Sequence, residues 1–403
     1  MNKWTIALIF IGSFTYSSSI RAQWSSIPSG TSQWITDIEF TDDNTGYLVA
    51  TFGVIKKTTD GGATWDSLAS GTTEYMDDID FTSADTGYAV GGNAINNTPT
   101  ILKTTDAGNT WVEQNVPLTQ HVAGAYFLNS DLGYAIGDGG DVIKTINGGT
   151  TWIWKTTVPS FNLADVYFHS ADTGFVVGMA GIFKTTNGGS SFFDLNLSVF
   201  FGGLTAIHFT SHDIGYVVNV SGLIGKTTDG GNTWTQQTSG VTSQLYAIAF
   251  VDDNVGYTVG RDASVEGKIL STVDGGATWT IDSITPDIMQ GVYVSSSNVA
   301  LAVGRNGTIL TNVSTTIVKE TEQETVDFVV YPNPVINELT FEFENTQKRK
   351  ITIYNTNGQL VLSLDSKEKA KTIDLENYTN GVYYYLVKSA GGETIGTGEF
   401  VKQ

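Results

Sequence analysis

Acidic side chains recur at alternating positions on short stretches that predict β-strands. Asp37 and Glu39 share one stretch, Asp78 and Asp80 share a second, and Asp165 stands alone on a later one. Paired carboxyl groups could catalyse glycoside hydrolysis, and clustered carboxylates could hold a hard cation such as calcium. No Asp-x-Asp-x-Asp-Gly loop is present. We favour a solvated acidic lining, so we expect no catalytic residue and no metal site here.

Two histidines, His208 and His212, are four residues apart, a spacing that suits a metal pair on a helix. They flank the end of a predicted strand and its turn, so the helical geometry is absent. The chain has no cysteine, which excludes disulfides, thiolate zinc sites and cysteine nucleophiles. We therefore expect neither a metal nor a cofactor.

Self-similarity dominates residues 24–312. A Gly-Tyr or Gly-Phe step and a closing aromatic residue recur in order, and the closing aromatic residues are 40 to 46 positions apart. This period suits four short antiparallel strands per unit, as in the blades of a β-propeller. The steps begin at Gly46, Gly87, Gly133, Gly174, Gly215 and Gly256, and the closing residues are Trp65, Trp111, Trp152, Phe192, Trp234 and Trp279.

Six complete units precede a seventh, Gly291–Leu310, that lacks its last strand. The segment Trp24–Gly30 is similar to Trp65–Gly71, which follows an Asp-Gly-Gly turn. We expect it to supply the missing outer strand and so remove the free sheet edge. The predicted fold class is all-β, a seven-bladed β-propeller followed by a small immunoglobulin-like β-sandwich.

Two recurring residues in each unit have a local explanation. The glycine of the Gly-Tyr step follows an Asp or Asn by two positions, and we expect it to supply a positive φ. We expect the lysines of the third strands to lie on a solvated outer face. These lysines are Lys57, Lys103, Lys144, Lys184 and Lys226.

The Thr-x-Asp-x-Gly-x-Thr-Trp elements, such as Thr58–Trp65 and Thr227–Trp234, resemble the Asp-box of BNR-repeat propellers. With the Gly-Tyr step, the units most resemble photosystem II stability/assembly factor propellers. The resemblance implies that each Asp-box stabilises a hairpin turn of its blade and takes no part in catalysis. The residues in this structural role are Asp60, Trp65, Asp106, Trp111, Asn147, Trp152, Asn187, Asp229, Trp234, Asp274 and Trp279.

Sialidases also carry Asp-boxes, and resemblance to them would imply three arginines around a substrate carboxylate. Beyond residue 22 only Arg261, Arg305 and Arg349 remain, and Arg349 falls in the C-terminal region. Two arginines cannot form that cluster, so a sialidase is excluded.

One face of the predicted ring gathers the links between blades and two insertions, Gly92–Pro99 and Arg261–Gly267. Aromatic residues stand just before the inner strands there. They could stack a sugar or grip a protein loop, and packing between blades is the alternative. The candidate ligand-binding residues are Trp34, Tyr75, His121, Phe161, Phe201 and Arg261.

Residues 1–22 have the layout of a secretory signal peptide, residues 23–312 form the propeller, and residues 313–327 read as a polar linker. Residues 328–403 resemble the C-terminal sorting domain of the type IX secretion system of Bacteroidetes. Its landmarks here are Tyr331–Pro334, Asn357, Gly358, Gly381, Tyr383, Tyr385 and Lys402. The resemblance implies the type IX secretion machinery as a partner, and passage through the periplasm to the outer-membrane surface or the medium.

The formal net charge of −20 makes nucleic-acid binding improbable, because an acidic surface repels phosphates. We expect a monomeric, non-catalytic binding or adhesion propeller with an unknown extracellular glycan or protein ligand. The alternatives are a glycan-active hydrolase of the Asp-box propeller class and an envelope assembly scaffold.

Overall fold

A computed structural model describes residues 24–93, 96, 98–158, 162–195, 203–313, 328–355, 359–390 and 394–403. The chain divides into two compact units, Met1–Thr315 and Thr316–Gln403. The predicted signal peptide and nearly all of the predicted linker lie outside the described residues, so their boundaries stay predictions. Within the described ranges there is no apolar helix of membrane-spanning length.

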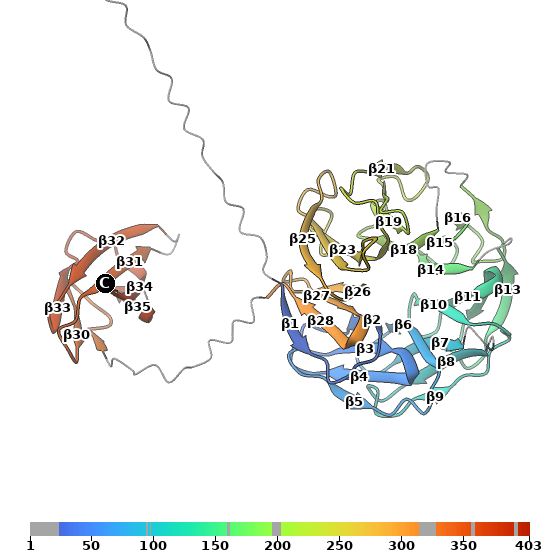
Figure 1. The fold of residues 1–403 in the computed structure, drawn as a ribbon, viewed down its shortest axis with the longest axis horizontal. Coiled ribbons are helices and arrows are strands. Elements are labelled where there is room, and N and C mark those ends of the chain that lie inside the picture. Colours follow the sequence, from blue (N-terminus) through green and yellow to red (C-terminus); the bar gives the residue numbers. More distant parts are fainter. Residues whose placement is uncertain are drawn as a thin grey trace, which may run out of the picture. The chain divides into compact units, whose positions relative to one another are not determined.

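In the first unit, seven antiparallel sheets of four strands surround a central axis (Figure 1). This ring confirms the predicted seven-bladed β-propeller. Blades one to three are built from β2 (Ile35–Phe40), β3 (Gly46–Ala50), β4 (Val54–Thr58), β5 (Asp66–Leu68), β6 (Tyr75–Phe81), β7 (Gly87–Asn93), β8 (Thr98–Thr104), β9 (Val112–Glu113), β10 (Val122–Phe127), β11 (Gly133–Gly137), β12 (Asp141–Thr145) and β13 (Ile153–Thr157).

The later blades repeat the same order, with the first strand of each blade innermost. Blades four to six are built from β14 (Leu163–Phe168), β15 (Gly174–Gly178), β16 (Gly181–Thr185), β17 (Phe193–Asp194), β18 (Leu204–Phe209), β19 (Gly215–Asn219), β20 (Ile224–Thr227), β21 (Thr235–Gln237), β22 (Leu245–Phe250), β23 (Gly256–Arg261), β24 (Gly267–Thr272) and β25 (Thr280–Thr285). Short 3₁₀ turns are η1 (Thr51–Gly53), η2 (Asp138–Gly140) and η3 (Arg305–Gly307).

Blade seven closes the ring with both ends of the repeat region. It consists of β26 (Met289–Val294), β27 (Ala300–Gly304), β28 (Thr308–Thr311) and β1 (Ser25–Pro28). Ser26 pairs with Leu310 and Ile27 with Ile309, antiparallel. The predicted exchange of the N-terminal strand into blade seven is therefore confirmed, and the last sheet has no open outer edge at β28.

The second unit is a β-sandwich of two sheets around one core. One sheet contains β29 (Phe328–Tyr331), β30 (Glu338–Phe343) and β33 (Ala370–Asp374), and the other contains β31 (Arg349–Asn355), β32 (Leu360–Ser366), β34 (Gly381–Ser389) and β35 (Thr394–Lys402). Phe341, Ile351 and Phe400 are fully buried between them. Asn357 and Gly358, which the sequence placed in a hairpin, lie outside the described residues.

The glycine of each Gly-Tyr step does not have the predicted positive φ. Among the described glycines, those with positive φ include Gly61 (71°) and Gly62 (91°) of the Asp-box turn, whereas Gly46 is absent from that group. A Cβ on Gly46 would lie 2.6 Å from the Phe40 ring. Glycine is required there because an aromatic ring of the same blade covers its Cα.

Aromatic rings pack the blades against one another. Phe81 of blade two stacks on Tyr47 of blade one with centroids 4.0 Å apart, and meets Trp111 of its own blade edge-on at 6.2 Å. The same stacking joins Tyr88 to Phe127 at 3.7 Å. Burial of such rings stabilises the packing of one sheet on the next.

The recurring lysines do not lie on a solvated face, contrary to the sequence prediction. The Nζ of Lys57 donates to the carbonyl of Ala107 in the next blade's Asp-box turn at 3.0 Å, and the Tyr47 hydroxyl donates to the same oxygen at 3.0 Å. Lys57 also lies over the Tyr47 ring. We call this pair of donors on one carbonyl of the following blade the inter-blade clamp.

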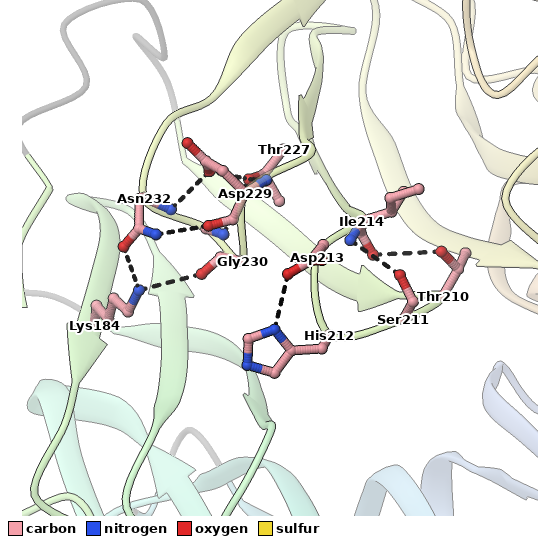
Figure 2. A network of polar contacts seen from close by, with 11 residues as sticks. Lys184, Thr210, Ser211, His212, Asp213, Ile214, Thr227, Asp229, Gly230 and Asn232 are labelled. Carbon is pink, nitrogen blue, oxygen red and sulfur yellow. Dashed lines mark hydrogen bonds and ion pairs between the residues drawn. The ribbon is translucent and has the colours of Figure 1, made fainter.

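The clamp recurs around the ring with small variations. Tyr88 and Lys103 both donate to Gly148 O, at 2.9 and 2.6 Å. In blade four Phe175 replaces the tyrosine, and Lys184 donates to Gly230 O at 3.1 Å and to Asn232 Oδ1 at 2.8 Å (Figure 2). In blade five Tyr216 and Lys226 both donate to Gly275 O, at 3.2 and 2.8 Å.

Blade three differs, because its two donors reach different carbonyls: Tyr134 donates to Ala171 O and Lys144 to Gly188 O. Among the described residues, the paired clamp therefore joins blades one, two and five to the blade that follows each.

We predict a non-additive loss of stability when one clamp is dismantled. Tyr88→Phe and Lys103→Met should each lower the free energy of unfolding by about 1 kcal/mol. The double variant should lose more than their sum, because the Gly148 carbonyl then loses both donors. Urea unfolding followed by tryptophan fluorescence measures this in the full chain, since residues 314–403 contain no tryptophan.

Lys155→Met removes a lysine of the same propeller that makes no clamp and should change stability by less than about 0.5 kcal/mol. A double variant whose loss of stability equals the sum of the two single losses, or is smaller, would contradict the clamp.

Candidate functional site

Each inner strand carries a β-bulge at the same position. The register with the second strand shifts between Ile35 and Asp37 in β2, and again between Leu163 and Asp165 in β14. Consequently Ile35 and Ile38 are both buried between sheets, although they are three residues apart. Asp37 and Glu39 are thereby turned toward the axis of the ring.

All five predicted acids line a central channel cavity of about 310 Å³. Their carboxylates also bond the neighbouring inner strand. Asp78 Oδ2 accepts from Ala125 N at 2.7 Å, and Asp165 Oδ2 accepts from Ile207 N at 2.8 Å. Glu39 Oε2 accepts from Phe81 N at 2.7 Å. The acids tie consecutive blades together at the axis.

Burial raises the pKa of every one of these carboxyl groups. It raises the pKa of Asp80 and Asp165 to about 7, and the nearby charge of Asp37 adds to the effect at both. The pKa of Asp78 is raised well above its usual range, by burial first and then by the nearby charge of Asp37. The channel therefore retains protons at a pH where exposed carboxyl groups are ionised.

Asp37 and Asp78 act as a coupled pair, because each carboxyl group shifts the pKa of the other. Glycosidases also use two carboxyl groups, which retaining enzymes hold about 5–5.5 Å apart and inverting enzymes about 6.5–9.5 Å apart. In this protein both groups accept hydrogen bonds from the neighbouring inner strand, Asp37 from Ile79 N at 3.2 Å and Asp78 from Ala125 N at 2.7 Å. The pair therefore has a structural role at the axis.

The two histidines lie in separate environments. His208 lines the channel, and burial lowers its pKa to about 4, so its ring is neutral at pH 7. His212 lies outside the channel and bonds Asp213 at 2.9 Å (Figure 2). They are not a joint ligand set.

The Asp-box carboxylates are engaged inside their own turns. Asp60 Oδ1 accepts from Thr58 Oγ1 and Thr64 N, and Asp60 Oδ2 accepts from Thr64 Oγ1 at 2.6 Å. Equivalent bonds to Thr233 lower the pKa of Asp229 to about 2. This geometry fastens a hairpin.

The opposite face carries the links between blades and the loops between second and third strands; we call it the loop face. Trp34 N–H donates to Thr51 Oγ1 at 3.2 Å, and Thr51 N–H donates to Trp34 O at 2.9 Å, so link and loop lie side by side. Phe52 follows Thr51 at a φ of 61° and meets Tyr75 edge-on at 5.0 Å. Phe52 and Tyr75 are 55% and 43% exposed.

The structure places the other predicted rim residues in different settings. His121 Nε2 lies 2.8 Å from Asp77 Oδ2 of the preceding blade. Burial opposes protonation of His121, but Asp77 outweighs it and raises the pKa. Phe161 and Phe201 lie outside the described residues.

Arg261 belongs to a cluster that sequence reasoning did not assemble. Its Nε donates to Gln244 Oε1 at 2.6 Å, and the Tyr246 hydroxyl donates to the same oxygen. Arg305 stacks on Trp34 with its guanidinium carbon 3.7 Å from the ring centroid. The scarcity of arginine was a usable signal, because residues 24–313 contain only these two.

Comparisons with known proteins agree with this architecture. Residues 16–113 and 65–154 match the model of the photosynthesis system II assembly factor YCF48. Residues 329–398 match the secretion system C-terminal sorting domain. The chain thus contains YCF48-like repeats within residues 16–154 and a secretion system sorting domain at its C-terminal end. Export by the type IX system to the cell surface or the extracellular space follows from the second match.

Solved structures share the propeller fold. YCF48 bound to a D1 peptide superposes with a TM-score of 0.60 at 20% identity, over 72% of this chain and 96% of that one. The GH74 enzyme of Niastella koreensis superposes with a TM-score of 0.59 at 17% identity, over 80% of this chain and 59% of that one. At these identities the likeness concerns fold alone.

One curated relative is an ulvan lyase, NLR42, of Nonlabens ulvanivorans. It is 30% identical over 77 residues, which is 19% of this chain and 14% of the lyase. The chain thus spans about one seventh of the length of this relative.

We predict that propeller stability falls as pH rises through 7. The pKa of Asp165 is about 7 in the fold and about 3.9 in the unfolded chain. The contribution of Asp165 to the free energy of unfolding is therefore fully present below about pH 4 and is lost as the pH rises through 7. Asp165→Asn cannot ionise. The melting temperature of the wild type should therefore fall, relative to Asp165→Asn, by about 3 °C or more between pH 5 and pH 8.

Asp229→Asn is the matched control, because that group stays ionised across the whole range. Parallel melting curves for wild type and Asp165→Asn from pH 5 to 8 would refute the assignment.

Proposed function

We propose that the propeller is a non-catalytic, extracellular binding domain that takes its ligand on the loop face. Exposed Phe52 and Tyr75 are the observation that carries this proposal. Large aromatic side chains exposed beside one another on a loop surface are typical of recognition sites. The rigid ring beneath them fixes their positions.

The channel acids support a binding role over a catalytic one. Their oxygens accept hydrogen bonds from backbone N–H groups of the next blade. A catalytic acid must instead reach a substrate proton. The sorting domain supplies the route outward, with the secretion machinery as its partner.

A glycan-active enzyme remains the second candidate function. It is favoured by the propeller fold shared with a GH74 enzyme and by the short match to an ulvan lyase. Such an enzyme would need reactive groups elsewhere than Asp37 and Asp78. The two functions are distinguished by incubating the full chain with a panel of polysaccharides. An enzyme would release reducing ends or unsaturated sugars, and a binding domain would not.

We predict that the ligand is retained by the loop face and not by the opposite face, which carries the Asp-box turns. Phe52→Asn with Tyr75→Ser should reduce retention on glycan and protein arrays at least about tenfold, because the aromatic contact area is lost. Asn tolerates the positive φ at position 52. Affinity is measured by biolayer interferometry on the best array ligand.

Ile146→Ser with Val273→Ser is the control on the Asp-box turns, where both side chains are exposed. Equal affinity of the loop-face variant and the wild type, or turnover of the bound ligand, would count against the proposal.

A further inference from the structure

The two arginines of the propeller lie together on its loop face. Arg261 ends β23 in blade six, and Arg305 begins η3 in blade seven. Residues 23–327 carry 32 acidic and 11 basic side chains, yet within the described residues neither arginine makes an ion pair. Two guanidinium groups in an acidic protein are thus left without a carboxylate partner.

Arg305 is held in place without using its hydrogen-bond donors. Its guanidinium lies flat against Trp34 of blade one, 3.7 Å from the ring centroid. Its Nε is buried and has no hydrogen-bond partner. Stacking occupies the face of the guanidinium, and the N–H donors lie along its edge. The buried Nε is out of reach of a ligand, so an anion would accept hydrogen bonds from the terminal amino groups of this partly buried side chain.

Arg261 is directed to the same place by a different contact. Gln244 Oε1 accepts from both Arg261 Nε and the Tyr246 hydroxyl. Burial raises the pKa of Tyr246, and the positive charges of Arg261 and Arg305 both oppose that rise. Arg261 N–H donates to Gln244 O and Arg305 N–H donates to Ile288 O, each just before the inner strand of its own blade. The two arginines therefore begin equivalent loops on the same face, at the junction of blades six and seven.

Aromatic surface continues from this point along the loop face. Trp34 is bonded to Thr51, and the next residue, Phe52, meets Tyr75. The order around the ring is Arg261 and Tyr246 in blade six, Arg305 in blade seven, Trp34 and Phe52 in blade one, and Tyr75 in blade two. An extended ligand could touch both the cations and the aromatic rings.

We propose that Arg261, Arg305 and Trp34 form a subsite for a carboxylate- or sulfate-bearing sugar within an acidic polysaccharide. This inference rests on the proposed loop-face binding. The guanidinium fork matches a carboxylate or sulfate, and the neighbouring rings suit the flat faces of sugars. Two cations without a basic stripe do not fit a nucleic acid.

The test is binding of the full chain to three polysaccharides of different charge. Polygalacturonate, dextran sulfate and uncharged dextran serve as probes in biolayer interferometry at about 50 mM salt, below physiological ionic strength. At least one charged polymer should bind about tenfold or more tightly than dextran. Arg261→Gln and Arg305→Gln should each weaken that binding about tenfold, and Arg305→Lys should weaken it less.

Lys155→Gln removes the same charge from blade three and should leave binding within about twofold of the wild type. Equal loss with Lys155→Gln, or equal affinity for dextran and both charged polymers, would overturn the subsite. Melting temperatures within about 2 °C of the wild type show that each variant is folded.

Failure of this inference can be told from failure of the proposed function. A protein or neutral glycan whose binding requires Phe52 and Tyr75, but not the arginines, would overturn the anion subsite and leave loop-face binding intact. If the loop-face variants bound every array ligand as tightly as the wild type, both the anion subsite and loop-face binding would be overturned.

Discussion

One interaction recurs at the joints between blades: a tyrosine hydroxyl and a lysine ammonium of one blade hold a single backbone carbonyl of the next. It is complete at blades one, two and five. That carbonyl belongs to the Asp-box turn, whose own side chains already fix its shape. The tyrosine ring simultaneously stacks on the inner phenylalanine of the following blade. Turn, strand and neighbour are therefore fixed together, and a blade is incomplete without the one before it.

Much of the architecture was predictable because it repeats. The period of the closing aromatic residues gave the number of strands per blade, and similarity between Trp24–Gly30 and Trp65–Gly71 placed β1 beside β28. Contacts between blades were not predictable in the same way. The roles assigned to Gly46 and Lys57 were wrong, because a repeat shows that a residue recurs but not what it touches. Gly46 lies under Phe40 of its own blade, whereas Lys57 reaches the next blade.

The candidate site shows the same limit. Acids at Asp37 and Asp78 were visible from their alternation, but their hydrogen bonds to the next blade depend on bulges that no simple alternation reveals. Arg305 and Trp34 come from opposite ends of the repeat region and meet only because the ring closes. A site formed where the two ends of the repeat region meet cannot be recognised from a pattern along the sequence.

The pairing of β1 with β28 also has a consequence for biogenesis. The first strand of the propeller, Ser25–Pro28, acquires its partner only when Thr308–Thr311 is present. A chain interrupted before Thr308 would leave β1 without that partner and blade seven without its third strand. Closure of the ring therefore requires the whole repeat region, from its first strand to its last.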